Sequence, residues 1–385
     1  MALDVYLTDA CNLRCRYCFN WDEPEAPRIG FEDVCSILRA AYQENNRYVS
    51  ITGGEPFLYK PIFEVLDFAH RLGYWITILS HGGLLDETRI ARLRPFWRLR
   101  VRISVDGPDR ETHDRLRGEG TFDTTMEKID LLVRHGINVG VGVTVSEGNV
   151  EAVPDILRMC VEKKVAFVRC VPVSRVNKGK AARVTSELHE HLLASLIDFA
   201  LTHADALDWP DPAAAAAPAS IPALTTRRCM AGRRFFGIRP NREIVPCPLI
   251  AGHPDVPRVV FDGPESFERL GRQMDALFAG MRNRLDGICS TCEFREVCYG
   301  GCLAEKLSFD LPMAAGQPVC TKFLLERLRD RYEHAGFDRL VRAWVCQLGS
   351  SMEASTSHAC MRHAPFWNMN FRVYDRWKET ALRFN

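Results

Sequence analysis

Residues 2–18 read ALDVYLTDACNLRCRYC, and this stretch decides how the rest of the chain is interpreted. Residues 2–8 are a short apolar, β-branched and aromatic run, which predicts a strand. Cys11, Cys15 and Cys18 follow directly, in the spacing C-x3-C-x2-C. A structural zinc site has four ligands, and a cubane iron–sulfur cluster has four irons to ligate. Three cysteines on one tight loop therefore suggest a 4Fe–4S cluster with one iron left open, where a small molecule can bind.

The composition of the 385-residue chain argues against several classes of protein. Lys and Arg number 50 and Asp and Glu 49, so no electrostatic footprint for nucleic acid or an anionic membrane is expected. No window stays apolar for about 18 residues, and no signal peptide is visible at the N-terminus. The 15 cysteines without an export signal predict a cytoplasmic protein. In that compartment, clustered cysteines indicate metal or cluster ligands and not disulfides.

Strand and helix patterns alternate through the N-terminal half of the chain. Strands are predicted at residues 2–8, 47–52, 74–79, 99–105, 136–146 and 164–173. Helices are predicted at residues 31–44, 61–72, 121–135, 149–162 and 186–203. This alternation predicts an α/β fold with a parallel sheet, in which the turns after the strands hold the functional site.

The cysteine loop and the turns after the second and fourth strands resemble those of the radical S-adenosylmethionine (SAM) enzymes. The shared features are C-x3-C-x-aromatic-C with Tyr17 at the aromatic position, then GGE at residues 53–55, then SVDG at residues 104–107. The resemblance implies a partial (β/α)6 TIM-like barrel. It also implies that the open iron of the cluster chelates SAM, and that an electron from the cluster cleaves SAM to a 5′-deoxyadenosyl radical. A zinc loop or a half-filled disulfide pattern is the alternative.

The same resemblance implies where SAM is bound. Glu55 would contact the methionyl ammonium, and Ser104 and Asp106 would reach the ribose and methionyl ends. Arg117 would pair with the SAM carboxylate, for which a guanidinium fork is suited, and Asn149 would lie near the adenosine. The alternatives are a solvated helix start for Arg117 and a helix N-cap for Asn149. The implied cofactor-binding residues are Tyr17, Gly53, Gly54, Glu55, Ser104, Asp106, Arg117 and Asn149.

One departure from the family pattern is His81. The third strand commonly ends in Thr-Asn-Gly in these enzymes, whereas here it ends in Ser80-His81-Gly82. His81 is therefore a candidate to contact substrate or to tune the site. The alternative is an ordinary turn residue.

A second group of cysteines lies in the C-terminal half, with a central spacing of C-x2-C-x5-C-x3-C. It resembles the SPASM extension of radical SAM enzymes, which binds two auxiliary 4Fe–4S clusters. By this resemblance the second auxiliary cluster would be held by Cys289, Cys292, Cys298 and Cys320. The first auxiliary cluster would be held by Cys229, Cys247 and Cys302. The alternative is two zinc sites.

The first auxiliary cluster lacks a fourth cysteine in this prediction. Some relatives supply one shortly after the first cysteine, but here that stretch reads MAGRRFFG at residues 230–237. An open iron or a ligand from elsewhere in the chain is therefore expected. Cys346 and Cys360 of the C-terminal tail are candidates for that ligand, or for the donor of a hydrogen atom to a substrate radical.

The predicted organisation has four parts. Residues 1–204 form the barrel, and residues 205–224, an alanine run between prolines, form a linker or insertion. Residues 225–325 form the cysteine-rich SPASM extension. Residues 326–385 form a helical and aromatic tail.

The expected function is radical oxidation or cross-linking of a ribosomal peptide, with help from the auxiliary clusters. The alternatives are oxidation, epimerisation or decarboxylation of a small natural product (a sugar, nucleoside or porphyrin-type precursor) and a non-enzymatic metal-binding scaffold. Expected partners are an electron donor such as flavodoxin or ferredoxin and either a separate leader-recognition protein or none, because the first cysteine lies at residue 11. Neither nucleic acid nor a membrane is an expected partner.

Overall fold

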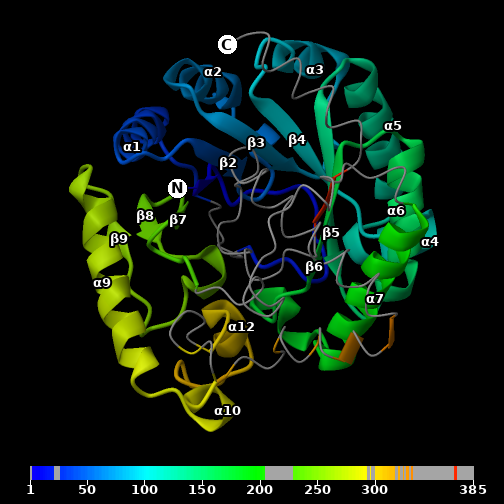
Figure 1. Ribbon diagram of the computed structural model, residues 1–385. Coiled ribbons are helices and arrows are strands. Elements are labelled where there is room, and N and C mark those ends of the chain that lie inside the picture. Colours follow the sequence, from blue (N-terminus) through cyan, green and yellow to red (C-terminus); the bar gives the residue numbers. More distant parts are fainter. Residues whose placement is uncertain are drawn as a thin grey trace, which may run out of the picture.

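The structure is a computed structural model (Figure 1). It describes residues 2–20, 27–203, 229–292, 295, 300–316, 320, 324, 327, 328, 331, 332 and 368–370. Within these residues the strands form a 10-stranded sheet in the order β10-β6-β5-β4-β3-β2-β1-β7-β8-β9. The helices of the N-terminal half lie along the outer side of this curved sheet, so the opposite face of its strands looks toward the middle of the molecule (Figure 1).

Parallel strands alternate with helices in the N-terminal half, and each strand pairs with the next in sequence. The strands are β1 (Ala2–Tyr6), β2 (Tyr48–Thr52), β3 (Trp75–Ser80), β4 (Leu99–Ser104), β5 (Asn138–Val145) and β6 (Phe167–Pro172). The longer predicted helices are α1 (Phe31–Gln43), α2 (Ile62–Leu72), α5 (Thr121–Arg134), α6 (Val153–Glu162) and α7 (Ser186–Thr202). Short 3-10 turns are η1 (Pro56–Leu58), η2 (Val150–Ala152) and η3 (Asn177–Ala181). The predicted α/β fold with a parallel sheet is confirmed.

Two short helices, α3 (Glu87–Leu93) and α4 (Arg110–Arg117), are absent from the sequence prediction. Each begins after an aspartate whose side chain accepts a hydrogen bond from a backbone N–H of the first turn. Asp86 accepts from Arg89 at 2.7 Å, and Asp109 accepts from Thr112 at 2.8 Å. Such an N-cap stabilises a short helix that apolar periodicity does not reveal.

The apolar core lies between the sheet and the helices. On the helix-covered face of the strands, Val5, Ile51, Ile78, Val101 and Val141 are all 0% exposed. Burying a side chain of this size contributes roughly 1.5–3 kcal/mol. Successive residues of a strand point to opposite faces, so the residues between these point to the inner face. The core therefore holds the parallel strands in place from one side and leaves the inner face for other chemistry.

Beyond residue 228 the chain extends the same sheet. β7 (Phe235–Ile238) pairs in parallel with β1, and β8 (Glu243–Val245) and β9 (Val259–Val260) follow antiparallel. α9 (Glu265–Arg282) packs against β8 and β9. The predicted linker at residues 205–224 lies outside the described residues, and the sheet runs on between the parts that it was expected to separate. Local periodicity does not predict this pairing, because it does not specify which distant strand joins the edge of a sheet.

The remaining described elements are short. They are η4 (Pro248–Ile250), α10 (Gly287–Ser290), α12 (Leu303–Ser308) and β10 (Asn368–Asn370). β10 pairs antiparallel with β6, so three residues of the aromatic end of the predicted tail form a strand, which the sequence did not predict. The physical reason is that an edge strand such as β6 presents unpaired N–H and C=O groups that an added strand satisfies.

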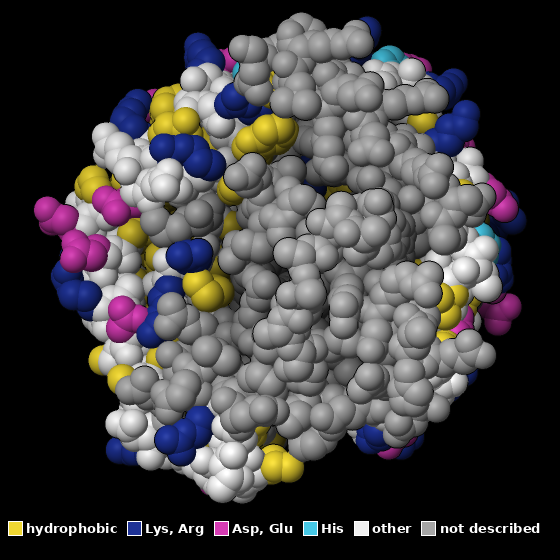
Figure 2. Space-filling model, in the orientation of Figure 1, with side chains coloured by type: hydrophobic (Ala, Val, Ile, Leu, Met, Phe, Trp, Pro, Cys, Tyr) yellow, Lys and Arg dark blue, Asp and Glu magenta, His cyan; other side chains and the backbone are white. Residues whose placement is uncertain are grey.

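The described surface carries charges of both signs. In Figure 2, Lys and Arg side chains are interspersed with Asp and Glu side chains over the visible described part. This agrees with the near balance of 50 basic and 49 acidic residues in the sequence. None of the described helices combines the length and apolar character needed to cross a membrane.

Candidate functional site

The cysteine loop follows β1 and packs against the turn that follows β2. Gly54 N donates to Thr8 O at 2.7 Å, and Glu55 N donates to Ala10 O at 2.8 Å. A Cβ atom at Gly53 or Gly54 would lie 2.2 Å from the carbonyl oxygen of Thr8 or Ala10, respectively. The close approach of the cysteine loop therefore requires both glycines, a reason that the sequence prediction did not contain.

Glu55 is fully buried, and residues at the end of β3 hold its carboxylate. Its Oε1 accepts hydrogen bonds from Phe57 N at 3.1 Å and from Ser80 Oγ at 2.9 Å. Its Oε2 accepts from His81 N at 3.1 Å, and His81 Nε2 lies 3.2 Å away. A buried carboxylate is stable only with such donors. They fix a negative charge at the C-terminal edge of the sheet, where it can meet a cation.

His81 joins the turn after β3 to the cysteine loop. Its Nδ1 accepts a hydrogen bond from Gly83 N at 3.0 Å, which leaves the ring proton on Nε2. Nε2 faces Asn12 Oδ1 at 2.8 Å as well as Glu55. Burial lowers the pKa of His81 from its ordinary value, so the neutral ring is favoured. The structure thus gives His81 a positioning contact, and its contact with a substrate stays a prediction.

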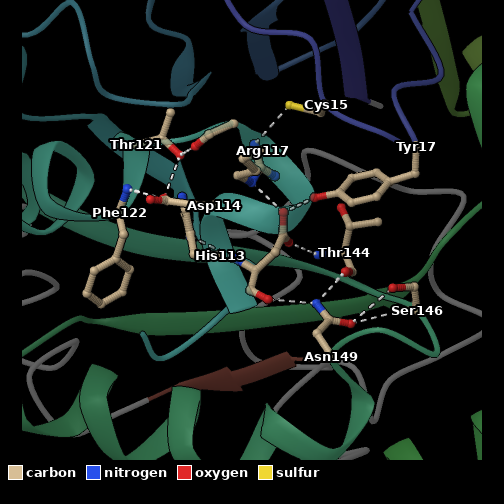
Figure 3. A network of polar contacts seen from close by, with 12 residues as sticks. Cys15, Tyr17, His113, Asp114, Arg117, Thr121, Phe122, Thr144, Ser146 and Asn149 are labelled. Atoms are coloured by element: carbon tan, nitrogen blue, oxygen red, sulfur yellow. Dashed lines mark hydrogen bonds and ion pairs between the residues drawn. The ribbon is translucent and has the colours of Figure 1, made fainter. Parts of the chain in front are cut away.

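Asp106, two residues after β4, is the centre of a second polar network, whose members Tyr17, Arg117 and Thr144 are labelled in Figure 3. Its carboxylate accepts hydrogen bonds from Tyr17 Oη, from Arg117 Nε and from Thr144 N, the last at 2.6 Å. Burial raises the pKa of Asp106, and the neighbouring Arg117 opposes this. The network ties the cysteine loop, through Tyr17, to the ends of β4 and β5.

Arg117, the last residue of α4, also reaches the cysteine loop. Its Nη1 lies 3.9 Å from Cys15 Sγ (Figure 3), and Arg16 N donates to Leu116 O at 3.1 Å. A guanidinium beside a thiol favours the thiolate, which is the form that binds a metal. The structure pairs Arg117 with Asp106, and the expected pairing with the SAM carboxylate stays a prediction.

Asn149 holds the turn that follows β5. Its Nδ2 donates to Asp106 O at 2.9 Å and to Thr144 O at 3.0 Å, and its Oδ1 accepts from Ser146 N at 2.8 Å (Figure 3). Its side chain makes no N-cap hydrogen bond to η2, so it does not act as the helix cap that was the alternative. Ser104 ends β4 and lies at the same edge of the sheet. SAM contacts of Ser104 and Asn149 stay predictions.

The chemistry of the loop fits an iron–sulfur cluster. Cys11, Cys15 and Cys18 are all partly buried on one loop, where Cys18 N donates to Cys15 O at 3.3 Å. Burial raises the pKa of Cys11 to about 11 and also raises that of Cys15. Ligand thiols lose their protons when they bind metal. Among the described residues, no three Cys, His, Asp or Glu side chains converge closely enough to hold a single metal ion. The thiolates that hold a cubane cluster bind separate irons, so they need not converge on one point.

The comparison with known families agrees with this geometry. Residues 5–160, from β1 into α6, match the Radical SAM superfamily. The chain carries a radical SAM domain. The predicted resemblance to radical SAM enzymes is confirmed over these residues.

Relatives that match most of the chain fall into more than one functional class. The chain is 26% identical over 341 residues to an AdoMet-dependent heme synthase of Oleidesulfovibrio alaskensis, covering 82% of this chain and 85% of the relative. It is 26% identical over 334 residues to the mycofactocin maturase MftC of Mycolicibacterium smegmatis, covering 82% and 81%. The crystal structure of Streptococcus suis SuiB bound to precursor peptide SuiA has the same fold, with a TM-score of 0.64, 19% identity and coverage of 83% and 75%.

Cysteines predicted for the second auxiliary cluster gather near α10 and α12. Burial raises the pKa of Cys289, and the thiols of Cys320 and Cys292 add to this, which places the three within electrostatic reach of one another. The buried Lys306 acts on Cys289 in the opposite direction. A positive charge beside several thiols suits a cluster of thiolates.

Cysteines predicted for the first auxiliary cluster lie on neighbouring segments. Cys229 and Cys247 are buried, at 1% and 3% exposure. Gly232 N donates to Pro246 O at 3.1 Å, so the segments that carry these two cysteines run side by side. Cys302 directly precedes α12, which packs against η4, the turn that follows Cys247. The other predicted cysteines, Cys298, Cys346 and Cys360, lie outside the described residues.

The inner face of the parallel strands is polar, which the sequence analysis did not state. Asp4 of β1 interacts with Ser50 of β2 and lies within electrostatic reach of Arg102 of β4 and Arg169 of β6. Burial raises the pKa of Asp4 to about 7, although these three neighbours lower it. In the described strands β1 to β6, this face carries the arginines Arg100, Arg102 and Arg169 against the single carboxylate of Asp4. Such a face suits an anionic group of a substrate.

Two residues of the site, Asn12 and Thr144, were not singled out from the sequence. Asn12 lies between the first two cysteines, and Thr144 lies near the end of β5, where the other site residues also follow strands. These positions in the sequence could therefore have marked both residues as candidate site residues. Their partners, His81 and Asp106, were not predictable because they come from other strands.

Proposed function

We propose that this radical SAM protein cleaves SAM reductively and uses the 5′-deoxyadenosyl radical to abstract a hydrogen atom from a peptide, which is then oxidised or cross-linked. One observation carries this proposal. The cysteine loop, the Glu55 carboxylate and the Asp106–Arg117 network meet at the C-terminal edge of the parallel strands, the edge where such folds place their sites.

The chain's own residues would bind and orient SAM. Glu55 would bind the ammonium of SAM, because Ser80 and His81 hold its carboxylate in place before the ligand arrives. Arg117 donates a hydrogen bond from its Nε to the Asp106 carboxylate. The guanidinium has five N–H donors, so its Nη groups would remain for the SAM carboxylate and for Cys15.

The cysteines would supply redox chemistry. Bound to them, a SAM-binding 4Fe–4S cluster would provide the electron for cleavage of SAM, and auxiliary clusters would provide a place for the electron released by the substrate. The buried thiols of the downstream array support this part of the proposal. A reduced flavodoxin or ferredoxin would be the external electron donor, and a separate protein would present a leader peptide.

Peptide modification is supported by two relatives. One is a mycofactocin maturase, and the other has been solved with a precursor peptide. A second candidate is a small substrate that carries carboxylates, which is supported by the heme synthase relative and by Arg102 and Arg169 on the inner face.

Deuterium transfer distinguishes these candidates. Anaerobically reconstituted protein would be given SAM, dithionite and either a deuterated peptide encoded beside its gene or a deuterated small carboxylate. The proposal predicts deuterium in 5′-deoxyadenosine and the loss of hydrogen mass from the peptide alone. Transfer from the carboxylate alone would favour the second candidate. Cleavage of SAM without transfer from any peptide would count against peptide modification.

A further inference from the structure

Glu305 is a carboxylate with an unexplained environment. It lies in the first turn of α12, and its side chain is 22% exposed. Its Oε1 atom is fully buried, and none of the described residues donates a hydrogen bond to it. A buried carboxylate oxygen without a donor is costly. A partner that the described residues do not supply would satisfy this atom.

The basic group that faces this oxygen atom, His189, does not account for its burial. His189 Nε2 of α7 lies 3.9 Å from Glu305 Oε1, which is beyond hydrogen-bond reach. His189 Nδ1 lies 2.9 Å from Thr185 O and donates to it, so Nε2 of the neutral ring carries no proton. Burial lowers the pKa of His189 from its ordinary value, which disfavours the charged ring that an ion pair would need.

Glu305 is instead placed beside a predicted cluster ligand. Cys302 directly precedes α12, and residues three apart at the start of a helix lie on one face. The thiol of Cys302 is the charged neighbour that acts on the Glu305 carboxyl, so the two groups are within electrostatic reach. Cys302-x2-Glu305 also has the separation of the C-x2-C pairs that ligate iron–sulfur clusters.

The predicted first auxiliary cluster has a ligand position to fill. Its three cysteines lie on neighbouring segments, because the Gly232–Pro246 hydrogen bond joins the segments that carry Cys229 and Cys247, and α12 packs against the turn after Cys247. No fourth cysteine is available in the stretch where relatives carry one. Carboxylate oxygen is a known ligand type for iron in proteins.

We propose that the Glu305 carboxylate is the fourth protein ligand of the first auxiliary cluster, beside Cys229, Cys247 and Cys302. This inference rests on the proposed function, because it requires a cluster at these cysteines. It predicts a site-differentiated cluster, in which one iron has an oxygen ligand and three have sulfur ligands. The iron bound by Glu305 is then closed to small exogenous ligands until the carboxylate is removed.

Electron paramagnetic resonance of the reduced protein tests this inference. The parent is the full chain with Cys11, Cys15 and Cys18 replaced by Ala, so that only auxiliary clusters contribute signals. It is compared with the same chain carrying Glu305→Ala or Glu305→Cys, each with and without cyanide. Iron content is measured in every sample.

The parent spectrum is expected to be insensitive to cyanide. Glu305→Ala should open one iron, so that cyanide shifts one auxiliary signal. Glu305→Cys should restore insensitivity to cyanide with an altered signal, because a thiolate replaces the carboxylate. If Glu305→Ala loses the cluster, recovery of iron in Glu305→Cys supports the inference, and failure of Glu305→Cys to recover it overturns the inference.

Matched controls separate ligation from packing. His189→Ala removes the facing imidazole, and Glu190→Gln changes a carboxylate on α7 that pairs with Arg327 at 3.0 Å. Both should keep the parent spectrum. The ligand inference would be overturned, and the proposed function left standing, by either of two results. One is a parent spectrum that already responds to cyanide, and the other is a spectrum that stays the same as the parent's in both Glu305 variants. A wild-type chain that binds no iron would overturn the proposed function as well.

Discussion

The two cysteine-bearing regions of the molecule are built in opposite ways. The loop after β1 is hydrogen-bonded to completed elements on several sides: to the turn after β2 through Glu55 N, to Asp106 through Tyr17, and to α4 through Arg16 N. The downstream cysteines come from segments far apart in the sequence, and the helices beside them are only four and six residues long, in α10 and α12.

This difference indicates how each region depends on its metal. A loop that is hydrogen-bonded to regular strands and helices adopts its conformation before a cluster binds. Cysteines that come from separate short elements are expected to take their final arrangement from the bound metal, as in other small metal-folded modules. The parallel sheet therefore supplies a preorganised site, and we expect the extension to become ordered when its proposed clusters bind.

The largest expected effect comes from crowding the preorganised loop. In Gly54→Ala the new Cβ would lie 2.2 Å from Ala10 O, a backbone atom that cannot move aside without shifting the loop. SAM cleavage should fall by about 100-fold, as expected for displacement of a site by about 1 Å. The release of 5′-deoxyadenosine measures this. Gly252→Ala, whose Cβ would meet nothing within 4 Å, is the matched control and should keep full activity.

Loss of the Asp106 hydrogen bonds should lower the free energy of unfolding of the protein. Asp106→Asn leaves the buried Arg117 without its counter-charge, and loss of one partner of a buried pair costs about 3 kcal/mol. Urea denaturation of the apoprotein measures the free energy of unfolding. Asp123→Asn removes the exposed partner of Arg110 and should change nothing measurable. Equal effects of the two variants would mean that Asp106 does not organise the site.

Removal of iron should affect the two regions unequally. In chelator-treated protein, proteases should cut within residues 287–316, while residues 27–203 stay protected by the core of the sheet. Reconstitution with iron and sulfide should slow the first cleavage severalfold. Mass spectrometry of the fragments locates the cuts. Early cleavage within the parallel strands of the apoprotein would remove the distinction between the regions.

The smallest effect concerns Asp114, which supports the start of α5. Partial burial raises its pKa, but hydrogen bonds from Phe122 N, Gly120 N and Thr121 Oγ1 outweigh this and lower the pKa below 3.8. Asp114→Ala should cost about 1 kcal/mol at neutral pH. Because the folded-state pKa of Asp114 is depressed, the wild type exceeds Asp114→Ala in its free energy of unfolding by the full amount above pH 3.8. This difference between the two proteins disappears as the pH falls through the folded-state pKa. A difference that grows on acidification would contradict this.

Most of the parallel sheet was predictable because each strand and each longer helix has its own local pattern. The alternation in LRVRISV at residues 99–105 even contains the polar inner face, since Arg100 and Arg102 alternate with apolar residues. The pairing of β7 with β1 was not predictable, because a strand's sequence does not name the distant strand it will join.

The same limit applies to the site. Tyr17, Asp106 and Arg117 were each expected to serve SAM, but their hydrogen bonds to one another were not expected, since they arise from loops that meet only in the folded chain. Glu305 was missed for another reason. Its spacing from Cys302 is visible in the sequence, but its burial is not.

The central claim is that the preorganised loop, with Glu55 and Arg117 around it, generates a radical from SAM. The most direct test is anaerobic reconstitution of the wild-type chain, reduction with dithionite in the presence of SAM, and measurement of 5′-deoxyadenosine and methionine, with Cys15→Ala in parallel. Both products are expected in equal amounts from the wild type, and neither is expected from Cys15→Ala. Iron-loaded wild-type protein that releases neither product, or Cys15→Ala protein that releases both, would contradict it.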